Sequence, residues 1–558
     1  MQLASRLAAR RGFSTIGRFQ LPAVVGEPFR HYPPGSEDAS KLAAACAETR
    51  GEVIDIPCVV NGKEYFTGDI MTQTMPSDHG HVLANIHKAT PEIIADAIKT
   101  AEANRLEWAN MPFEHRMSIF RKAADLVAHK YRYKMNATTM LGQGKTVWQA
   151  EIDSAVETID FFRLNTQFAQ EIYNVQPPLN SPNTWNRLEY RELEGFLVAI
   201  SPFNFTAIGM NLPTAPAMMG NTVLWKPAST AVLSNYLGYR ILLEAGMPAG
   251  VISFLPCAGK TIGPALDHES FAGLHFTGST STFNTLWSQI GNNLDNYKTY
   301  PRIVGETGGK NFHMVHPSAD MKHTAFNTIR GAFEYQGQKC SAASRLYVPQ
   351  SMWEGQGMKE LMIETTKSLH QGQPDDFKSF LSAVIDKSAF GDHVEYLETA
   401  KKDDVEIIVG GNYSDKEGYF VEPTIIVTKD PQYRTMKEEI FGPVLTVYVY
   451  DDSKPNAWAD VCHLCNNTSP FGLTGSIFSQ DRGATIEAAE ILKHACGNMY
   501  LNDKSTGAVV GEQPFGGARA SGTNDKAGSH LNLLRWVSAK TIKENTVPIT
   551  THEYPHMQ

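Results

Sequence analysis

The sequence lacks several features that would place it outside the ordinary globular proteins. It has no apolar run long enough to span a bilayer, so no transmembrane helix is predicted. It also has no low-complexity block and no fixed-period repeat, which argues against a disordered chain or a solenoid. The net charge of −9 leaves no excess of basic residues, which speaks against a nucleic-acid binder.

Cysteine is scarce, with seven residues in 558. An odd, scattered set is typical of a reducing compartment without structural disulfides. Cys462 and Cys465 form a lone CxxC pair, and no second pair of ligands stands at a spacing suited to zinc. The segment 458–466 has helical character, so both thiols are expected on one buried face, and no metal site is predicted.

Acidic residues are missing from the N-terminus until Glu27. Residues 1–26 carry arginines and serines, with Leu3 and Leu7 among alanines but no continuous apolar core. This composition predicts a mitochondrial transit peptide and a mitochondrial-matrix location, and the alternative is a disordered basic tail. Residues 27–60 are expected to be irregular because Pro28, Pro33 and Pro34 interrupt them.

The chain length predicts two or three domains. Residues 195–200 form a short, fully apolar segment, as expected for a strand of a parallel sheet. Strand and helix patterns then alternate to residue 277, which indicates a Rossmann-like domain. The alternation resumes at Phe312, which predicts a second α/β domain. A cleft between two such domains is a preferred place for a ligand.

No GxGxxG fingerprint is present, but two other stretches point to chemistry. Residues 331–341 hold Cys340 between a lysine and a serine, and a thiol acts as a nucleophile only as its thiolate. Glu306 stands before a Gly-Gly pair that permits close approach of backbone or ligand. Alone, Cys340 reads more readily as a small buried hydrophobe. Together, the two residues suit an enzyme that forms and hydrolyses a thioester.

Seven ordered motifs strengthen this interpretation. They are Pro202-Phe-Asn-Phe205, Lys226-Pro-Ala-Ser229, Phe276-Thr-Gly-Ser279, Glu306-Thr-Gly-Gly-Lys310, Gly337-Gln-Lys-Cys340, Glu439-Ile-Phe-Gly-Pro443 and Pro514-Phe-Gly-Gly517. Over residues 60–540 the chain therefore resembles the aldehyde dehydrogenases. Cys340-Ser341, residues 502–508 and residues 515–524 make it most similar to the delta-1-pyrroline-5-carboxylate dehydrogenases, which oxidise glutamate semialdehyde to glutamate.

The resemblance implies a binding site for NAD, with NADP left open because Ser229 replaces a glutamate found in many NAD-preferring relatives. Many relatives also have glycine where this chain has Phe283. The implied cofactor-binding residues are Ser201, Lys226, Gly278, Ser279, Thr280, Ser281, Thr282, Glu439 and Phe441.

It further implies that Cys340 attacks the aldehyde, that Asn204 stabilises the oxyanion and that Glu306 activates water. The implied substrate-binding residues are Ser341, Gly507, Ala508, Glu157, Phe205 and Phe515. For Asn204 the alternative is a turn residue, for Gly507 a plain turn glycine, and for Glu157 a solvated or salt-bridged glutamate.

The expected architecture is an aldehyde-dehydrogenase-like α/β fold. It assigns 27–175 and 195–305 to an NAD-binding domain and 306–529 to a catalytic domain. It assigns 176–194 and 530–558 to a β oligomerisation element, so a homodimer or higher homo-oligomer is expected. Two alternatives remain, namely the same chemistry on another semialdehyde or aliphatic aldehyde, and a non-catalytic binding protein of this family.

Overall fold

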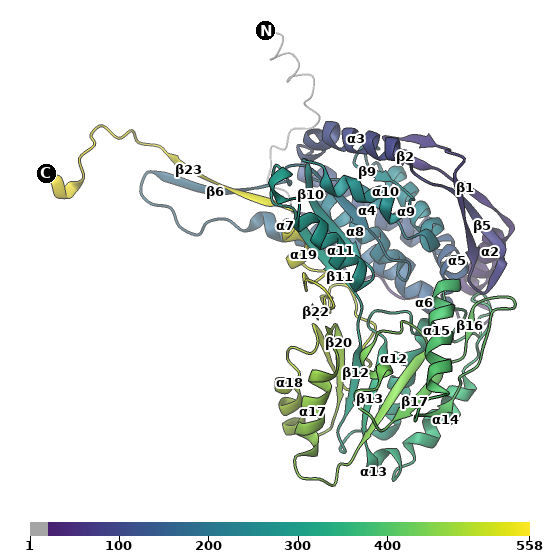
Figure 1. Ribbon diagram of the computed structural model, residues 1–558. Coiled ribbons are helices and arrows are strands. Elements are labelled where there is room, and N and C mark those ends of the chain that lie inside the picture. Colours follow the sequence, from purple (N-terminus) through teal and green to yellow (C-terminus); the bar gives the residue numbers. More distant parts are fainter. Residues whose placement is uncertain (1–19) are drawn as a thin grey trace.

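The computed structural model describes residues 20–558, which form two α/β lobes and a projecting two-stranded ribbon (Figure 1). Most of the predicted transit peptide, residues 1–19, lies outside the described residues. Residues 20–26 lie within them and contact the body, since the Leu21 N–H donates to Gln170 Oε1 at 2.6 Å. Among the described residues, no helix has the length and apolar character needed to cross a bilayer.

The first lobe contains a seven-stranded sheet in the order β11-β10-β7-β8-β9-β2-β3. Five neighbouring strands, from β11 at one edge to β9, run parallel to one another. Strands β2 and β3 form an antiparallel hairpin at the other edge. Its strands are β2 (Cys58–Val60), β3 (Lys63–Tyr65), β7 (Phe196–Ile200), β8 (Thr222–Lys226), β9 (Ile252–Phe254), β10 (Phe271–Thr277) and β11 (Arg302–Glu306).

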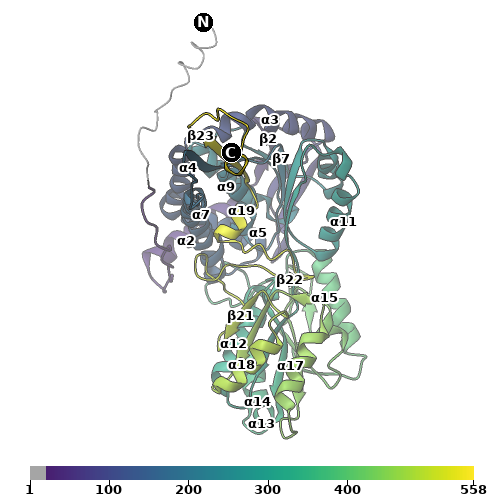
Figure 2. The same cartoon turned by 90° about the vertical axis from the view of Figure 1, so that its left-hand side faces the viewer.

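Helices of this lobe surround the sheet in both views at right angles (Figures 1 and 2). They are α3 (Pro91–Ala109), α4 (Phe113–Asp125), α5 (Arg132–Gln143), α6 (Val147–Ala150), α7 (Thr158–Asn174), α8 (Thr206–Met218), α9 (Val232–Ala245), α10 (Gly259–Ile262) and α11 (Thr280–Gly291). Two π-helical segments, η1 (Leu126–Tyr131) and η2 (Glu151–Glu157), lie between the α-helices on either side of them.

The second lobe contains another seven-stranded sheet, in the order β14-β17-β18-β13-β12-β20-β21. Only β14 runs antiparallel to its neighbour. The strands are β12 (Asn311–Val315), β13 (Ala343–Pro349), β14 (Glu406–Val409), β17 (Thr424–Thr428), β18 (Val444–Tyr450), β20 (Thr474–Phe478) and β21 (Asn498–Leu501). The helices are α12 (Met321–Phe333), α13 (Gln350–Trp353), α14 (Met358–Ser368), α15 (Lys387–Ala400), α16 (Arg434–Lys437), α17 (Ala457–Thr468) and α18 (Arg482–Ile491). Cys462 and Cys465 are both buried on α17, as predicted.

The N-terminal segment is more ordered than predicted. Helix α2 (Glu37–Gly51) begins after Ser36, whose side chain accepts from the Ala39 N–H, so the expectation of an irregular 27–60 is wrong. Pro28, Pro33 and Pro34 all precede this helix, and Ser36 followed by two acidic residues is a helix start signal. A three-stranded sheet of β1 (Ile54–Ile56), β5 (Asp78–His87) and β4 (Ile70–Met75) follows.

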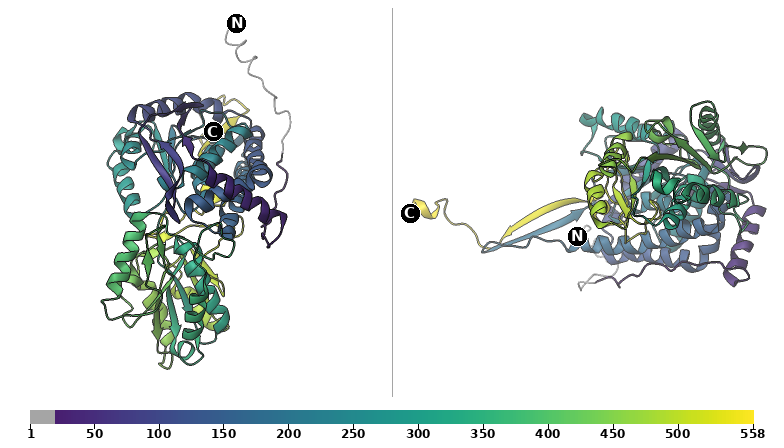
Figure 3. Two further views of the ribbon diagram at one scale, coloured as in Figure 1. Left: turned by 90° about the vertical axis from the view of Figure 1, so that its right-hand side faces the viewer. Right: turned by 90° about the horizontal axis from the view of Figure 1, so that it is seen from below.

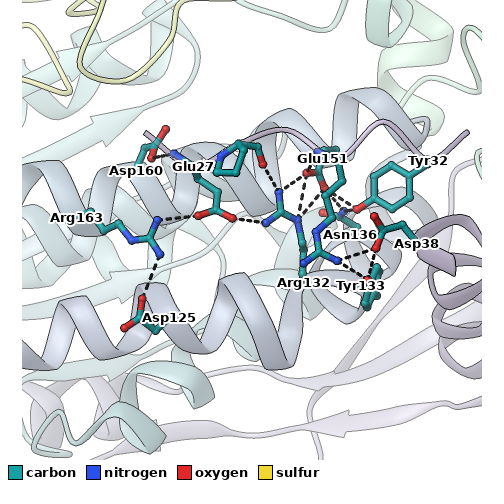
Figure 4. Close-up of polar contacts among 12 residues, drawn as sticks. Glu27, Tyr32, Asp38, Asp125, Arg132, Tyr133, Asn136, Glu151, Asp160 and Arg163 are labelled. Atoms are coloured by element: carbon teal, nitrogen blue, oxygen red, sulfur yellow. Dashed lines mark hydrogen bonds and ion pairs between the residues drawn. The ribbon is translucent and has the colours of Figure 1, made fainter. Parts of the chain in front are cut away.

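Residues 27–38 are fastened to the first lobe by a buried polar network (Figure 4). Arg132 forms ion pairs with Glu27 and Glu151, and the side chains of Arg132 and Glu151 are 1% and 0% exposed. Tyr32 Oη donates to Glu151 Oε2 at 2.6 Å. The Glu27 N–H donates to Asp160 Oδ1 at 2.8 Å. The segment thus packs as part of the lobe.

The projecting ribbon pairs β6 (Thr184–Arg191) with β23 (Ser538–Asn545) in antiparallel register. It leaves the body together with the C-terminus in Figure 1 and in the right-hand view of Figure 3. Helix α19 (His530–Leu534) packs beside α7 and precedes the ribbon. Residues far apart in the sequence are therefore joined in one extended element.

Candidate active site

Four predicted site residues stand where parallel strands of the first sheet end. Ile200 pairs with Lys226, and Thr277 pairs with Glu306, so these strand ends share one edge. Ser201 and Gly278 follow β7 and β10 directly. The carboxyl edge of a parallel sheet is where open α/β folds bind their ligands. The fold itself therefore gathers these residues.

A cavity beside this edge brings the predicted nucleophile and base together. Cys340 and Glu306 both line it, and each comes from a different part of the chain. Six predicted substrate-binding residues line the same cavity, namely Glu157, Phe205, Ser341, Gly507, Ala508 and Phe515. The predicted arrangement of these eight residues around one space is thus present in the structure.

Cys340 follows a short stretch of unusual backbone, η6 (Glu334–Gly337). Tyr335, Gln336 and Gly337 have φ values of 54°, 55° and 67°, in the left-handed region that non-glycine residues rarely adopt. Tyr335 Oη donates to the Gln143 carbonyl at 3.0 Å, and Gln336 Nε2 donates to the Gly144 carbonyl at 2.9 Å. Contacts from the first lobe therefore hold the loop that carries the nucleophile, which is how strain persists at functional sites.

The electrostatics of Cys340 keep its thiol protonated in this state. Burial, followed by the Glu306 and Glu439 carboxylates, raises its pKa to about 12. The N–H groups of Ser341 and Cys340 act in the opposite direction. A thiolate therefore needs a group that takes the proton or a positive charge placed nearby.

One carboxylate oxygen of Glu306 accepts a hydrogen bond, and the other does not. Its Oε2 accepts from the Gly517 N–H at 2.8 Å, whereas its buried Oε1 has no partner among the described residues. Burial raises the pKa of Glu306 well above its ordinary value, and the Lys526 ammonium partly opposes this. A carboxylate of raised pKa with a free oxygen is suited to accept a proton from water.

Asn204 is buried and tied to the nucleophile loop. Its Nδ2 donates to the Gln338 carbonyl at 3.1 Å, two residues before Cys340. One of its two amide hydrogens is therefore used, and Asn204 is not among the residues that line the cavity, although Phe205 is. The bond also fixes the side chain relative to the thiol.

The far end of the cavity offers hydrogen-bond donors. Ser341 Oγ lies 2.8 Å from Thr506 Oγ1. Gly507 has φ of 91°, and within residues 20–558 neither its N–H nor that of Ala508 is used in a backbone hydrogen bond. Such paired N–H groups form a small anion-binding nest. Phe205 and Phe515 provide apolar walls.

Glu157 ends η2 and lines this cavity. Burial, reinforced by the nearby Asp153 carboxylate, raises its pKa to about 8. An incoming cation would stabilise the ionised form.

The predicted cofactor residues fall into two groups. Ser279, Thr280 and Ser281 line a surface groove together with Glu439. Ser279 caps α11 by accepting from the Thr282 N–H, so Thr282 serves the cap and is exposed. Glu439 accepts from the Gly309 N–H at 2.7 Å, and burial raises its pKa to about 7.

The remaining cofactor residues lie near these but outside the groove. Within residues 20–558, Lys226 Nζ donates only to the Pro227 carbonyl, at 3.3 Å, and Ser201 Oγ accepts from Trp225 Nε1. Phe441 has φ of 56° and packs edge-on against Phe203.

Phe283, the departure from the common glycine, fills a specific space. It is buried and stacks on Phe276. A Cβ on Gly305 would lie 2.2 Å from its ring. The larger side chain is therefore accommodated by a glycine on β11.

A charged cluster at the cavity wall escaped the sequence reasoning. The buried Glu334 carboxylate accepts from Lys339 at 3.0 Å and from Lys504 at 3.1 Å. These cations hold its pKa at about 2, although burial opposes them. All three residues line the cavity. The only signal was Lys339 beside Cys340, because nothing local links Glu334 to Lys504.

Comparisons with known proteins agree with the geometry. Residues 66–542 match the Aldehyde dehydrogenase family. The chain is 57% identical over 556 residues to a mitochondrial delta-1-pyrroline-5-carboxylate dehydrogenase of Dictyostelium discoideum, covering 99% of both chains. It is 49% identical over 538 residues to the human mitochondrial protein of that name, covering 96% of this chain and 94% of the other.

Solved structures give the same result. A delta-pyrroline-5-carboxylate dehydrogenase from Mycobacterium tuberculosis bound with NAD has a TM-score of 0.93 at 45% identity, covering 98% of this chain and 100% of the other. A Thermus 1-pyrroline-5-carboxylate dehydrogenase with bound NAD has a TM-score of 0.88 at 31% identity, covering 94% and 100%. The predicted fold is confirmed, and the chain belongs to the aldehyde dehydrogenase family.

Proposed function

We propose that this protein oxidises L-glutamate 5-semialdehyde, formed by opening of 1-pyrroline-5-carboxylate, to L-glutamate with NAD in the mitochondrial matrix. This reaction is the second step of proline breakdown. The observation that carries the proposal is one cavity lined by Cys340, by Glu306 and by the free N–H groups of Gly507 and Ala508. Relatives at 48–57% identity are named mitochondrial enzymes of this activity.

The residues at the sheet edge fit a dinucleotide. The first turn of α11 offers N–H groups for a pyrophosphate, as helix N-termini commonly do. Lys226 and Glu439 offer a cation and a carboxylate for ribose hydroxyls, and Gly308 leaves room because a Cβ there would lie 1.9 Å from Glu439 Oε2. NAD, when bound, supplies the acceptor for the two-electron hydride.

The side chains perform the remaining steps. The Cys340 thiol loses its proton to solvent, its sulfur forms a bond to the aldehyde carbon, and the carbonyl oxygen becomes an oxyanion that accepts from Asn204 Nδ2 and the Cys340 N–H. Loss of hydride from that carbon leaves a thioester. Glu306 Oε1 then takes a proton from water, and the hydroxide adds to the thioester. The carbon–sulfur bond breaks to release the carboxylic acid and the Cys340 thiolate, and the acid loses its proton to solvent.

Substrate choice follows from the charges at the far end. The substrate carboxylate fits the N–H groups of Gly507 and Ala508 together with Ser341, and Lys339 and Lys504 add positive potential there. Its ammonium fits the Glu157 carboxylate. Aliphatic aldehydes would leave these polar groups unpaired, which is costly in a buried site.

A substrate panel tests the proposal. Purified protein is given NAD with pyrroline-5-carboxylate, succinic semialdehyde or propanal at equal concentration, and NADH absorbance is followed. We expect a clear preference for pyrroline-5-carboxylate. Equal rates on all three would contradict the substrate assignment, and no reduction by folded protein with NAD or NADP would favour a non-catalytic family member.

The β6–β23 ribbon supports homo-oligomerisation. An isolated two-stranded ribbon is marginally stable in water, and both of its outer edges are open. Trp185, Val547 and Ile549 on or near it are 55%, 48% and 82% exposed. Light scattering after gel filtration should show a dimer or higher species, and removal of residues 546–558 should weaken it. A monomer at micromolar concentration would contradict this assignment.

A further inference from the structure

A buried ion pair lies directly behind the substrate cavity and has no part in the chemistry described above. Lys145 Nζ lies 2.8 Å from Asp153 Oδ2, and both side chains are 0% exposed. Burial lowers the pKa of Lys145, and the Asp153 carboxylate is the main influence that raises it. The charge on Lys145 therefore depends on this partner.

Asp153 fixes the start of α8. Its two oxygens accept from the Thr206 N–H at 2.9 Å and the Ala207 N–H at 2.8 Å. These are the first two residues of the helix, whose N-terminal N–H groups have no partner within the helix. Asn204 and Phe205, which serve the oxyanion and the cavity wall, come immediately before them.

Lys145 connects the same point to the nucleophile loop. Its ammonium lies 3.7 Å from the centroid of the Phe205 ring and 4.7 Å from that of Tyr335. An ammonium that is removed from water is attracted to the face of an aromatic ring more strongly than an exposed one. Phe205 lines the cavity, and Tyr335 is the first left-handed residue before Cys340. One cation thus contacts an aromatic ring from each lobe.

Asp153 also lies on η2, which ends at Glu157. The pair therefore contacts the three elements that carry Glu157, Asn204–Phe205 and the Cys340 loop. We propose that Lys145 and Asp153 are positioning residues that set the distance between the Asn204 amide, the Phe205 ring and the Cys340 sulfur. The proposal rests on the proposed function, because it concerns the geometry of that same aldehyde site.

The energetics suggest which variants separate positioning from folding. Removing one partner leaves an uncompensated buried charge, which is strongly destabilising. Removing both charges together is often nearly neutral. Lys145→Met combined with Asp153→Asn keeps the shapes and leaves an amide oxygen to accept one α8 N–H, but it removes the ion pair and the cation over both rings.

The experiment compares this double variant with wild type, whose turnover of pyrroline-5-carboxylate separately tests the proposed function. We expect thermal melting close to wild type and NAD affinity, measured by quenching of intrinsic tryptophan fluorescence, within about twofold. We expect kcat to fall about tenfold to a hundredfold, because misplacement of reacting groups by about 1 Å has effects of that size. The Lys145→Met single variant should melt lower than the double variant.

Two results would overturn the proposal. One is a folded double variant whose kcat and KM stay within about twofold of wild type. The other is a loss of NAD affinity as large as the loss of kcat, which would indicate a general structural defect. If the double variant does not fold, Asp153→Glu decides, because it keeps both charges and displaces the α8 cap; unchanged kcat in that variant would equally refute positioning.

Discussion

The N-terminal polar network and the catalytic cavity differ in how many hydrogen-bond partners their buried charged groups have. In the network, the Glu151 carboxylate accepts from Arg132, Tyr32 and Asn136, and the second Arg132 contact goes to Glu27 (Figure 4). In the cavity, Glu306 Oε1 is buried without a partner. Lys310 Nζ, near Glu439, is likewise unpartnered, and burial lowers its pKa to about 7.

This difference identifies the cavity as the region in which the fold has lower local stability. Buried polar groups are normally satisfied, so each unpartnered one needs an explanation. Among the described residues Glu306 Oε1 is one of several, because Tyr239 Oη and Thr366 Oγ1 are also buried without a partner. The left-handed Tyr335 and Gln336 belong to the same pattern. The network joins the N-terminal segment to the first lobe through buried ion pairs, whereas the cavity leaves one Glu306 oxygen without a partner among the described residues. Substitutions should therefore separate stability from activity according to region.

Cys340→Ala should give the largest effect. Without the sulfur no thioester forms, so NADH production should fall at least about 1000-fold, as when other catalytic nucleophiles are removed. The melting temperature should change little, because the substitution removes only one sulfur atom from the side chain. Initial rates and differential scanning fluorimetry measure the two quantities. Appreciable residual turnover would contradict the assignment.

Glu151→Ala should lower stability and leave activity nearly unchanged, which is the reverse of Cys340→Ala. It strips Arg132 of its most buried partner, and breaking a buried pair costs about 3–5 kcal/mol. The urea midpoint should drop markedly, while kcat of the remaining folded protein stays near wild type. Glu37→Ala is the matched control, because its pair with Lys41 is exposed and should leave the midpoint unchanged. Similar urea midpoints for Glu151→Ala and Glu37→Ala would contradict the claim that the buried network contributes to stability.

Asn204→Ala should lower kcat about 100-fold to 1000-fold, the usual effect of losing one oxyanion donor, about 3 kcal/mol. Its bond to the Gln338 carbonyl makes a modest loss of stability part of the expectation. Steady-state kinetics give the ratio. If KM rises while kcat is unchanged, the residue binds substrate and does not stabilise the oxyanion.

The smallest effect concerns pH. With a pKa of about 8, Glu157 is mostly protonated at pH 7 and ionises as pH rises through 8. Attraction of the substrate ammonium therefore strengthens over that range, and KM for pyrroline-5-carboxylate should fall severalfold between pH 7 and 9. The fall should be absent for propanal and in Glu157→Gln. A pH-independent KM in wild type would contradict this role.

Much of this architecture could be predicted from sequence, because local patterns determine it. The apolar segment 195–200, for example, forms strand β7 of a parallel sheet, as expected. The ordered motifs located Cys340 and Glu306, and the fold then placed them in one cavity. Their roles, like the domain boundaries, remain predictions for the experiments above.

Other features depend on contacts between distant segments. The left-handed Tyr335 and Gln336 donate from their side chains to carbonyls far away in the sequence, at Gln143, Gly144 and Ala383. The π-helical turn of η2 and the meeting of Lys504 with Glu334 likewise have no local signature. Helix α2 is different, because its start signal is local. Ser36 caps the helix, although prolines that disfavour a helix stand just before it.

The central claim is that the hydrogen-bonded charges of the N-terminal network stabilise the fold, whereas the unpartnered Glu306 Oε1 acts as a base. The most direct test of this claim is to trap the acyl enzyme. Glu306→Gln is mixed with NAD and pyrroline-5-carboxylate, and intact-protein mass spectrometry is recorded alongside NADH absorbance. The free Oε1 as base predicts a single burst of NADH and an accumulated glutamyl thioester that maps to Cys340. Steady turnover at the wild-type rate without an adduct would contradict the account.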